Sequence, residues 1–324
     1  MSLLKKMLRE LPFSNDELQN LIATAQYRYK VFQIPKRKKN EFRTIAQPSL
    51  EIKLIQNWLT CKTLSSLPLH KAAMAYRIGQ SIAQHAAMHA NSRFLLKMDF
   101  INFFPSISAA DVCRYLVEVG HMSIEDAGII SSLVCWRDKV QNKLCLSIGA
   151  PSSPHLSNVI MNAFDKNIMK ICKPERVVYS RYADDLAFST NKKEVLSDIV
   201  RQVQVVCKEL EYPRLEINLK KTLSVSRAHR RVLVGLILTP DGQISLGRNK
   251  KRQLRSELYR FKRETLDDAA IPVLRGELAF AWSVENKFIH SMLRQFGNEI
   301  FRKLDLPFST IGKGAQAIRH NVIE

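Results

Sequence analysis

Two adjacent aspartates at the tip of a predicted β-hairpin constrain this chain more than any other feature. Residues 177–182 and 186–189 are rich in apolar and β-prone side chains, and Ala183-Asp184-Asp185 separates them. This pattern is typical of two antiparallel strands joined by a tight turn. Successive side chains of a regular strand point to opposite faces, so a turn is where neighbouring carboxylates can approach one cation. Taken alone, the pattern also fits an acidic surface hairpin.

The charge balance favours a polyanionic partner. The 324 residues include 50 Lys and Arg against 30 Asp and Glu, a formal net charge of +20. A globular chain this basic usually meets nucleic acid, and an anionic membrane surface is the second candidate. No apolar run approaches the ~18 residues of a spanning helix, and no signal peptide opens the chain. The six cysteines form no CxxC pair, which favours reduced thiols. We therefore expect a cytoplasmic protein without a membrane partner.

The order of the predicted elements indicates an α+β fold. Apolar periodicity predicts strands over 94–99, 215–219 and 232–238 and helices over 154–170 and 192–210. Strands and helices do not alternate regularly, and the hairpin signals imply antiparallel pairing. We therefore expect a sheet that carries helices on one face.

Three carboxylates are expected to meet at one edge of this sheet. Asp99 closes the strand 94–99, while Asp184 and Asp185 occupy the hairpin tip. Neighbouring strands would give the arrangement that holds two Mg²⁺ ions roughly 3.5–4 Å apart. One ion would lower the pKa of an attacking hydroxyl, and the other would steady a triphosphate and its leaving pyrophosphate. The sequence thus predicts Mg²⁺ as cofactor, with two ions per site.

Six ordered blocks of sequence resemble a known enzyme family. Four of them resemble motifs A, B, C and D of reverse transcriptases, and two resemble the fingers blocks: 99–106, 148–154, 182–185 and 219–222, with 42–59 and 75–82. Their order and spacing are far more specific than any single motif, and the likeness covers roughly residues 25–250. It implies an RNA-directed DNA polymerase with a right-hand fold of helical fingers, an antiparallel-sheet palm and a mainly helical thumb.

The resemblance also implies domain boundaries. They are an N-terminal segment with fingers over 1–92, palm with motif A over 93–118, a fingers insertion over 119–147, palm with motifs B to D over 148–238, and an RNA-binding thumb over 239–324. The thumb would then leave no room for an RNase H, integrase, maturase or endonuclease domain of usual size.

Residue roles follow from the same motifs. Asp99, Asp184 and Asp185 would form the catalytic, metal-binding triad, and the backbone carbonyl of Phe100 would add a metal ligand. The implied nucleotide contacts are Arg43, Asn102, Phe103, Phe104, Gly149 and Lys221.

The implied nucleotide contacts serve different functions, and several of these residues also have a simpler structural interpretation. Phe104 matches a steric gate against a sugar 2′-OH, or is an ordinary core phenylalanine. The amides of Asn102 and Phe103 would hold triphosphate oxygens, and the Arg43 fork would clamp them or stay solvated. Lys221 would protonate the leaving pyrophosphate, with Lys220 as competitor, or touch backbone phosphates.

Motif B carries one match and one departure. Gly149 would let the backbone approach the templating base pair, because glycine has no Cβ. Ile148 stands where many relatives have Gln, so a template-side contact is in doubt.

Two basic stretches are candidate nucleic-acid contacts. They comprise Lys36, Arg37, Lys38 and Lys39 near the fingers and Arg248, Lys250, Lys251, Arg252 and Arg255 on a thumb helix. Such residues grip phosphates without reading sequence. A solvated charged face is the alternative.

The compact form resembles the retron subgroup of bacterial reverse transcriptases. That resemblance implies a structured non-coding RNA, dNTPs, priming from an RNA 2′-OH, a branched msDNA product and a toxic effector restrained in anti-phage defence. Two sequence elements of retron enzymes are altered here. The Asn-Ala-x-x-His element corresponds to residues 85–89, where His85 replaces the Asn. The Val-Thr-Gly element corresponds to residues 233–235, where Val234 replaces the Thr and only the Gly is retained. The alternatives are another bacterial defence or abortive-infection reverse transcriptase, or an RNA-binding scaffold for an effector.

His85 and His89 stand one helical turn apart and also fit a pair of zinc ligands. No third ligand is evident. Packing or an RNA contact is the favoured interpretation.

Overall fold

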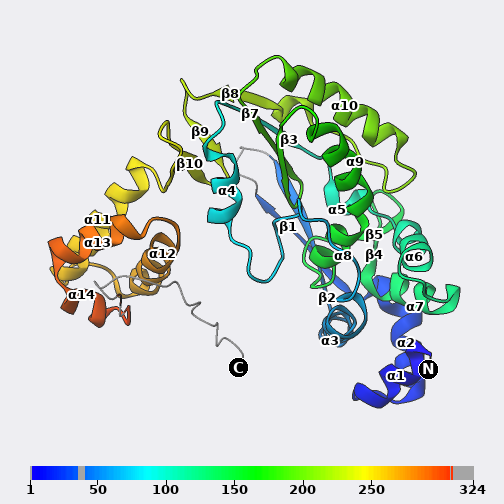
Figure 1. The fold of residues 1–324 in the computed structure, drawn as a ribbon. Helices are drawn as coiled ribbons and strands as arrows, with labels where there is room; N and C mark the ends of the chain where they lie inside the picture. Colours follow the sequence, from blue (N-terminus) through cyan, green and yellow to red (C-terminus); the bar gives the residue numbers. More distant parts are fainter. Residues whose placement is uncertain (1, 36–40, 307, 309–324) are drawn as a thin grey trace. The chain divides into compact units, whose positions relative to one another are not determined.

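The computed structural model describes residues 2–35, 41–306 and 308. The chain forms two compact units, residues 1–229 and 230–324, which we describe separately (Figure 1). Lys36, Arg37, Lys38 and Lys39 lie outside the described residues. None of the described helices is both long and apolar enough to cross a membrane.

A four-stranded antiparallel sheet forms the centre of the first unit. Its strands, in spatial order, are β6 (Val178–Tyr182), β7 (Asp185–Thr190), β3 (Phe94–Asp99) and β8 (Leu223–Ser226). The strand predicted over 94–99 and the hairpin around Ala183 are both confirmed. Pairing of β3 with β7 places Asp99 opposite Asp185, so the end of β3 meets the hairpin tip.

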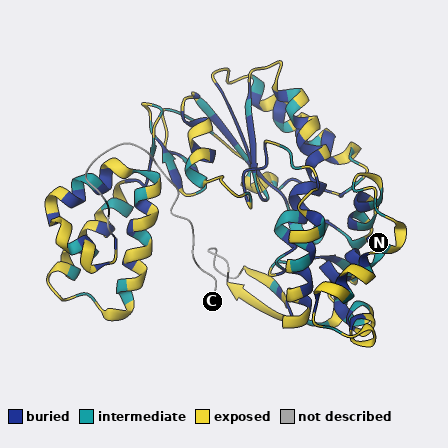
Figure 2. Ribbon diagram, turned by 60° about the horizontal axis from the view of Figure 1, so that its bottom comes forward, coloured by how far each residue is buried: buried dark blue, intermediate teal, exposed yellow. Residues whose placement is uncertain are grey.

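The two faces of this sheet are covered by different helices (Figure 1). On one face Leu186 and Phe188 enter a core shared with α9 (Asn162–Cys172) and α10 (Val195–Glu209). On the other face α4 (Ile82–Ala90) contacts β6. Helices on one face alone were expected; α4 adds a partial cover on the second, which its small residues Ala86 and Ala90 permit. Figure 2 shows the strands of the sheet as mainly buried.

The first unit contains further α-helices and two hairpins. They are α1 (Leu3–Glu10), α2 (Asn15–Thr24), α3 (Leu50–Leu59), α5 (Phe103–Ser106), α6 (Ala109–Glu118), α7 (Ile124–Val134) and α8 (Ser153–Ile160), with the hairpins β1 (Tyr29–Pro35)–β2 (Phe42–Pro48) and β4 (Cys135–Asp138)–β5 (Lys143–Leu146). A capping box starts α6: Ser108 Oγ accepts from the Asp111 amide, and the Asp111 carboxylate accepts from the Ser108 amide.

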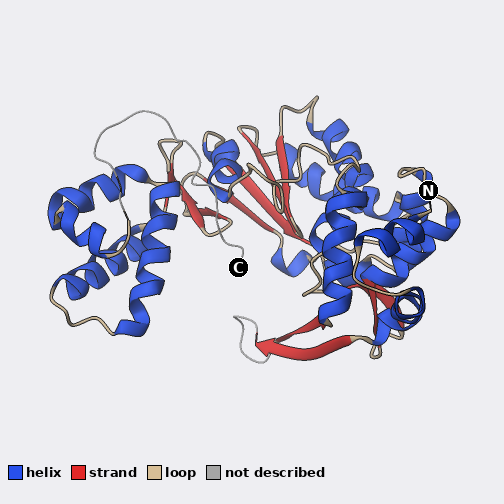
Figure 3. Ribbon diagram, turned by 90° about the horizontal axis from the view of Figure 1, so that it is seen from below, coloured by secondary structure: helices blue, strands red, loops and turns tan. Residues whose placement is uncertain are grey.

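The β1–β2 hairpin is long and exposed along most of both strands (Figure 3). Its base is held where the Ala46 amide donates to the carbonyl of Ile148 at 2.9 Å. Gly149 follows with φ +123°, and a Cβ there would lie 3.0 Å from the Ala46 carbonyl oxygen. Any side chain at this position would press on β2, so glycine is required by close approach as well as by its backbone angle.

Three elements differ from the sequence-based expectation. The helix predicted over 154–170 is two helices, α8 and α9, which separate at Met161. The strand predicted over 215–219 pairs only at Ile217, and a 3₁₀ turn (Leu219–Lys221) follows it. The strand predicted over 232–238 is interrupted, because Val234 and Gly235 take φ of +44° and +83° and turn the chain into a hairpin.

The second unit combines a small sheet with a helical bundle. Its elements are β9 (Arg231–Leu233), β10 (Leu236–Leu238), β11 (Ile244–Ser245), α11 (Arg248–Lys262), α12 (Ile271–Val284), α13 (Asn286–Phe296) and α14 (Asn298–Lys303), and the sheet order is β11-β10-β9. Leu254 and Leu258 of α11 are fully buried, as are Leu278 of α12 and Met292 of α13. The helices therefore share one apolar core.

Candidate active site

Backbone hydrogen bonds bring the three predicted triad residues together. The Phe100 amide donates to the Asp184 carbonyl at 3.3 Å, which joins the end of β3 to the hairpin tip. The Asn218 amide donates to the Asp99 carbonyl at 2.7 Å and holds the same strand end from the other side. The positions of the carboxylates are thus set by main-chain contacts from three separate segments.

The carboxylates of this triad repel one another. Burial and the Asp99 carboxylate raise the pKa of Asp184 above its ordinary value. Asp185 has an exposed side chain, yet the protein packed around it, followed by the Asp184 and Asp99 charges, raises its pKa to about 6. Like charges held this close disfavour ionisation of both partners.

Lys221 supplies the positive charge nearest to Asp99. Its ammonium donates to Asp99 Oδ2, and this bond raises the pKa of Lys221. Asp99 is 6% exposed, and its second oxygen, Oδ1, is buried without a hydrogen-bond partner. An unpaired buried carboxylate oxygen is costly, so this corner of the site needs a further cation or donor.

The triad fits a hard divalent cation in its chemistry. All its side-chain donors are carboxylate oxygens, which such ions prefer, and a bound cation would relieve the repulsion and pair Asp99 Oδ1. Within the described residues no three His, Cys, Asp or Glu side chains already converge as a ligand set. The Lys221 ammonium occupies Asp99 Oδ2 in this conformation, so metal binding requires the side chains to adjust.

A buried ion pair supports the hairpin tip from behind. Arg181 and Asp165 are both 0% exposed, and Arg181 Nη2 donates to Asp165 Oδ2 at 2.7 Å. Arg181 Nη1 donates to the Ala183 carbonyl at 3.1 Å, and Ala183 has a φ of +57°. Asn158 Oδ1 accepts from the same Nη1 at 3.1 Å. The guanidinium therefore holds the left-handed backbone that presents Asp184.

The residues after Asp99 turn away from the strand at once. Asn102 takes a φ of +49° and is exposed, and α5 begins at the next residue. Phe103 is buried and stacks on Phe100 at a centroid distance of 5.5 Å. Phe104 is only half-buried. Of the two rings, only Phe104 is therefore accessible to a ligand.

Tyr76 lies near both Asp184 and Arg43, though no hydrogen bond joins Tyr76 or Arg43 to a triad carboxylate among the described contacts. Arg43 is exposed on β2. Burial is the main cause of the raised pKa of the Tyr76 phenol. The Asp184 charge raises this pKa further, and the Arg43 charge lowers it. Tyr76 is 49% exposed and has a φ of +59°. This left-handed backbone conformation is uncommon and strained for an aromatic residue.

Sequence reasoning missed Tyr76, Arg181 and Asp165. Arg181 offered a weak signal, since it stands in an apolar strand immediately before the tip. Its partner Asp165 lies sixteen positions earlier on a helix, and no local pattern connects the two. Tyr76 offered no signal beyond its place in the second fingers block.

The predicted contacts on α11 fall into two groups. Lys250 pairs with Glu277 of α12, and Lys251 pairs with Glu285. Arg248, Arg252 and Arg255 are exposed. The arginines are therefore more available to a ligand than the lysines.

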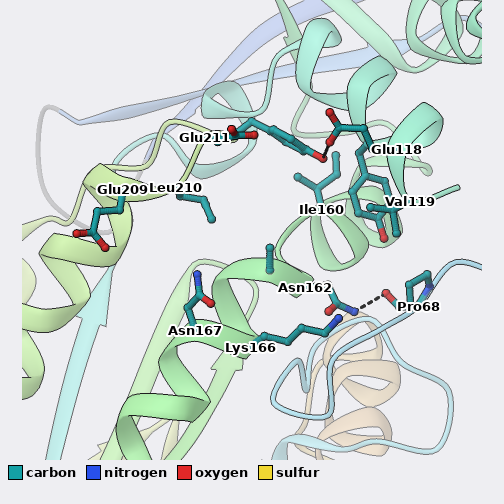
Figure 4. Close-up of a pocket in the computed structure, with 13 residues that line it drawn as sticks. Pro68, Glu118, Val119, Ile160, Asn162, Lys166, Asn167, Glu209, Leu210 and Glu211 are labelled. Carbon is teal, nitrogen blue, oxygen red and sulfur yellow. Dashed lines mark hydrogen bonds between the residues drawn. The ribbon is translucent and has the colours of Figure 1, made fainter.

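Figure 4 shows a cavity of about 390 Å³ in the first unit. It is lined by Glu118 at the end of α6, Asn162 and Lys166 of α9, and Leu210 after α10. None of the predicted site residues lines it. The predicted site residues therefore lie outside this cavity.

Known proteins resemble the chain over most of its length. Residues 34–252 match the family model described as reverse transcriptase (RNA-dependent DNA polymerase). The retron Ec83 reverse transcriptase of Escherichia coli is 36% identical over 85% of this chain and 89% of its own length. The chain belongs to the retron reverse transcriptase family. It is therefore an RNA-directed DNA polymerase, a nucleotidyltransferase, as the motifs predicted.

Two other retron reverse transcriptases of Escherichia coli are also similar. The Ec86 enzyme is 27% identical over 94% of this chain and 93% of its own length. The Ec73 enzyme is 31% identical over 82% and 86%. The likeness thus extends through both compact units of this retron reverse transcriptase.

Solved structures agree on the fold. Telomerase from Candida tropicalis, in complex with a TWJ fragment of telomeric RNA, superposes with a TM-score of 0.50 at 11% identity. The match covers 90% of this chain and 59% of that one, so the retron reverse transcriptase spans little more than half of its structural neighbour. The predicted α+β, right-hand polymerase fold is confirmed.

Proposed function

We propose that this enzyme copies a bound RNA into DNA by two-metal nucleotidyl transfer at the Asp99, Asp184 and Asp185 carboxylates. One observation carries the proposal: Asp99 lies opposite Asp185 in the β3–β7 register, and the Phe100 amide bonds to Asp184. Divalent cations, with Mg²⁺ as the first candidate, would activate the attacking hydroxyl and neutralise the phosphates. The three carboxylates and the Phe100 carbonyl would hold them.

The neighbouring residues of the chain would bind and orient the nucleotide. The Asn102 and Phe103 amides and the Arg43 guanidinium would take triphosphate oxygens. Phe104 would lie against the sugar, and Gly149 would admit the templating pair. Lys221, already bonded to Asp99, would hand a proton to the leaving pyrophosphate.

The domain roles are part of the same proposal. Fingers would comprise 1–92 and 119–147, palm 93–118 and 148–238, and an RNA-binding thumb 239–324. The exposed α11 residues Arg248, Arg252 and Arg255 support a phosphate contact in that last segment.

The retron family supports a finer reading of substrate and biology. The RNA would be a structured non-coding RNA that primes from an internal 2′-OH, and the product would be branched msDNA. A restrained effector in anti-phage defence would be the partner. A Candida telomerase solved with RNA supports an RNA partner only through its shared fold.

The test of the chemistry is divalent-dependent dNTP incorporation by wild type and Asp185→Asn. We expect the variant to lose activity, and equal rates would reject the assigned site. Sequencing of the nucleic acid that co-purifies tests the priming: a short branched RNA–DNA species is expected. Unlinked long cDNA would point to another subgroup of bacterial reverse transcriptases.

A further inference from the structure

Two histidines on the inner face of α4 take no part in the chemistry described so far. His85 and His89 are both 0% exposed and stand one turn apart, next to Ala86 and Ala90. The alanines let the helix approach the sheet closely, so the short imidazole side chains reach strand residues. Both imidazole rings therefore face the sheet.

The imidazoles are joined to the hairpin strands by three hydrogen bonds. His85 Nε2 and His89 Nε2 each lie 2.7 Å from Ser180 Oγ of β6, and His89 Nδ1 lies 2.8 Å from Ser189 Oγ of β7. One helix turn thus holds both strands of the hairpin. No third His, Cys, Asp or Glu completes a metal site with them in the described residues.

The direction of these bonds follows from the protonation states. Burial lowers the pKa of His85 to about 4 and, together with His85, that of His89 to about 3, so both rings are neutral at pH 7. A neutral imidazole has one donor and one acceptor, and Ser180 has a single hydroxyl proton. The two Nε2 atoms therefore cannot both accept from Ser180, so at least one of them donates to it.

One arrangement of donors pairs every N–H group and also uses the Ser180 hydroxyl proton. His85 Nε2 donates to Ser180, Ser180 donates to His89 Nε2, and His89 Nδ1 donates to Ser189. It leaves the lone pair of His85 Nδ1 unpaired, and that atom has no hydrogen-bond partner among the described residues. The reverse direction would instead bury an unpaired N–H, which is the costlier arrangement.

The same His85 ring contacts the residue that leads into the tip. It stacks on the Tyr182 ring with a centroid distance of 5.5 Å and an interplanar angle of 11°. Tyr182 pairs with Asp185, and residues directly opposite on paired strands share a face. The Tyr182 ring therefore lies on the face of the sheet that carries Asp185 and Asp99, and the His85 ring packs against it.

We propose that His85 is a positioning residue: its ring, fixed by Ser180 and His89, holds the Tyr182 side chain and thereby sets the orientation of the Asp184–Asp185 tip. The Arg181 guanidinium holds the tip from the opposite face of the same strand, so the tip is fixed from both sides. The inference rests on the proposed role of Asp184 and Asp185 as metal ligands.

The deciding comparison is His85→Ala with His85→Phe. The alanine variant loses the ring, whereas the phenylalanine variant keeps a ring against Tyr182 and leaves Ser180 free to donate to His89. We expect His85→Ala to lower kcat about 10- to 100-fold, because small misplacements of catalytic groups have effects of this size. His85→Phe is expected to stay within about threefold of wild type on the same grounds.

The readouts separate positioning from folding. Rates are measured per active site, by single-turnover extension with titrated enzyme on a primer–template, together with KM for dNTP and the Mg²⁺ concentration at half activity. Misorientation of the tip should lower kcat and raise the Mg²⁺ midpoint while KM for dNTP changes little. A purely structural role would lower the active fraction and leave kcat per active site unchanged.

Two control variants test whether a change in kcat is specific to His85. Met88→Ala alters the exposed side of the same helix, and Leu18→Ala makes a cavity in distant α2; neither should change kcat per active site. Wild-type kcat and Mg²⁺ midpoint in His85→Ala would overturn the inference, and so would a His85→Phe enzyme as slow as His85→Ala. An active Asp185→Asn enzyme would instead reject the proposed function itself.

Discussion

The Arg181 guanidinium and the Asp165 carboxylate form a fully buried ion pair directly behind the Ala183 turn. Tyr179 also donates its hydroxyl to Asp165, at 2.6 Å. Because the same guanidinium bonds the Ala183 carbonyl, this pair connects the stability of the helical core to the shape of the tip. A change at Asp165 should therefore affect both properties.

Asp165→Asn should destabilise the protein by about 3–5 kcal/mol, because it leaves a buried guanidinium without its counter-charge. The unfolding free energy from urea titration measures this. The control is Asp198→Asn, which breaks the exposed Arg201–Asp198 pair and should cost at most about 1 kcal/mol. Equal effects of the two substitutions would contradict the assigned role of the buried pair.

The Asp185 carboxyl should increasingly favour the folded, metal-free enzyme as the pH falls from 7 towards 5, whereas the buried, neutral His85 and His89 oppose this because their pKa values are lowered. The pKa of Asp185 is about 6 in the folded chain and about 3.9 when unfolded. Between these values the folded state binds more protons at Asp185 than the unfolded state does, so this group favours folding on acidification. On acidification from pH 7 to 5 in chelator, the melting temperature should therefore fall further for Asp185→Asn than for wild type. Identical slopes would show that Asp185 is not perturbed.

Lys221 should matter to catalysis and Lys220 should not. Only Lys221 is bonded to Asp99, so Lys221→Met removes a proton donor held at the triad. We expect a loss in kcat on the order of 10²-fold, typical of a general acid. Lys220→Met is the matched control, because it removes the same charge one residue away. A control as slow as Lys221→Met would indicate a general charge effect.

Local signals in the sequence predicted part of this site and could not predict the rest. The β-prone runs around Ala183 and the strand that ends at Asp99 each depend on neighbours within a few residues. The Lys221–Asp99 and Arg181–Asp165 bonds join residues far apart in the chain, and an arginine in an alternating strand looks the same whether it is solvated or paired. Their partners are set by packing alone.

The interrupted strand around Val234 illustrates a second limit. Val232 to Leu238 is apolar apart from Gly235, so composition favours one continuous strand. The turn at Val234 and Gly235 depends on positive φ values, which a valine adopts only where surrounding structure imposes them. Propensity was therefore overridden by the pairing of β9 with β10.

Phe104→Ala should raise the use of rNTPs relative to dNTPs, about 10-fold or more if the ring excludes the 2′-OH. The ratio of kcat/KM for the two sugars measures this. Phe103 is the internal control, since its ring is buried against Phe100. Phe103→Leu should lower stability and leave the ratio unchanged. An unchanged ratio in Phe104→Ala would favour a packing role for this residue.

The exposed arginines of α11 should carry more of the RNA affinity than the lysines beside them. Arg248→Glu and Arg252→Glu remove charges that have no ion-pair partner within the described residues, so each should flatten the slope of log K against log salt by about 0.7–0.9. Lys250→Met and Lys251→Met break the pairs with Glu277 and Glu285, so they should lower the melting temperature more than they change the slope. Filter binding of the co-purified RNA at several salt concentrations distinguishes the two groups. Equal slope changes in all four variants would mean that the lysines exchange their carboxylate partners for phosphates when RNA binds.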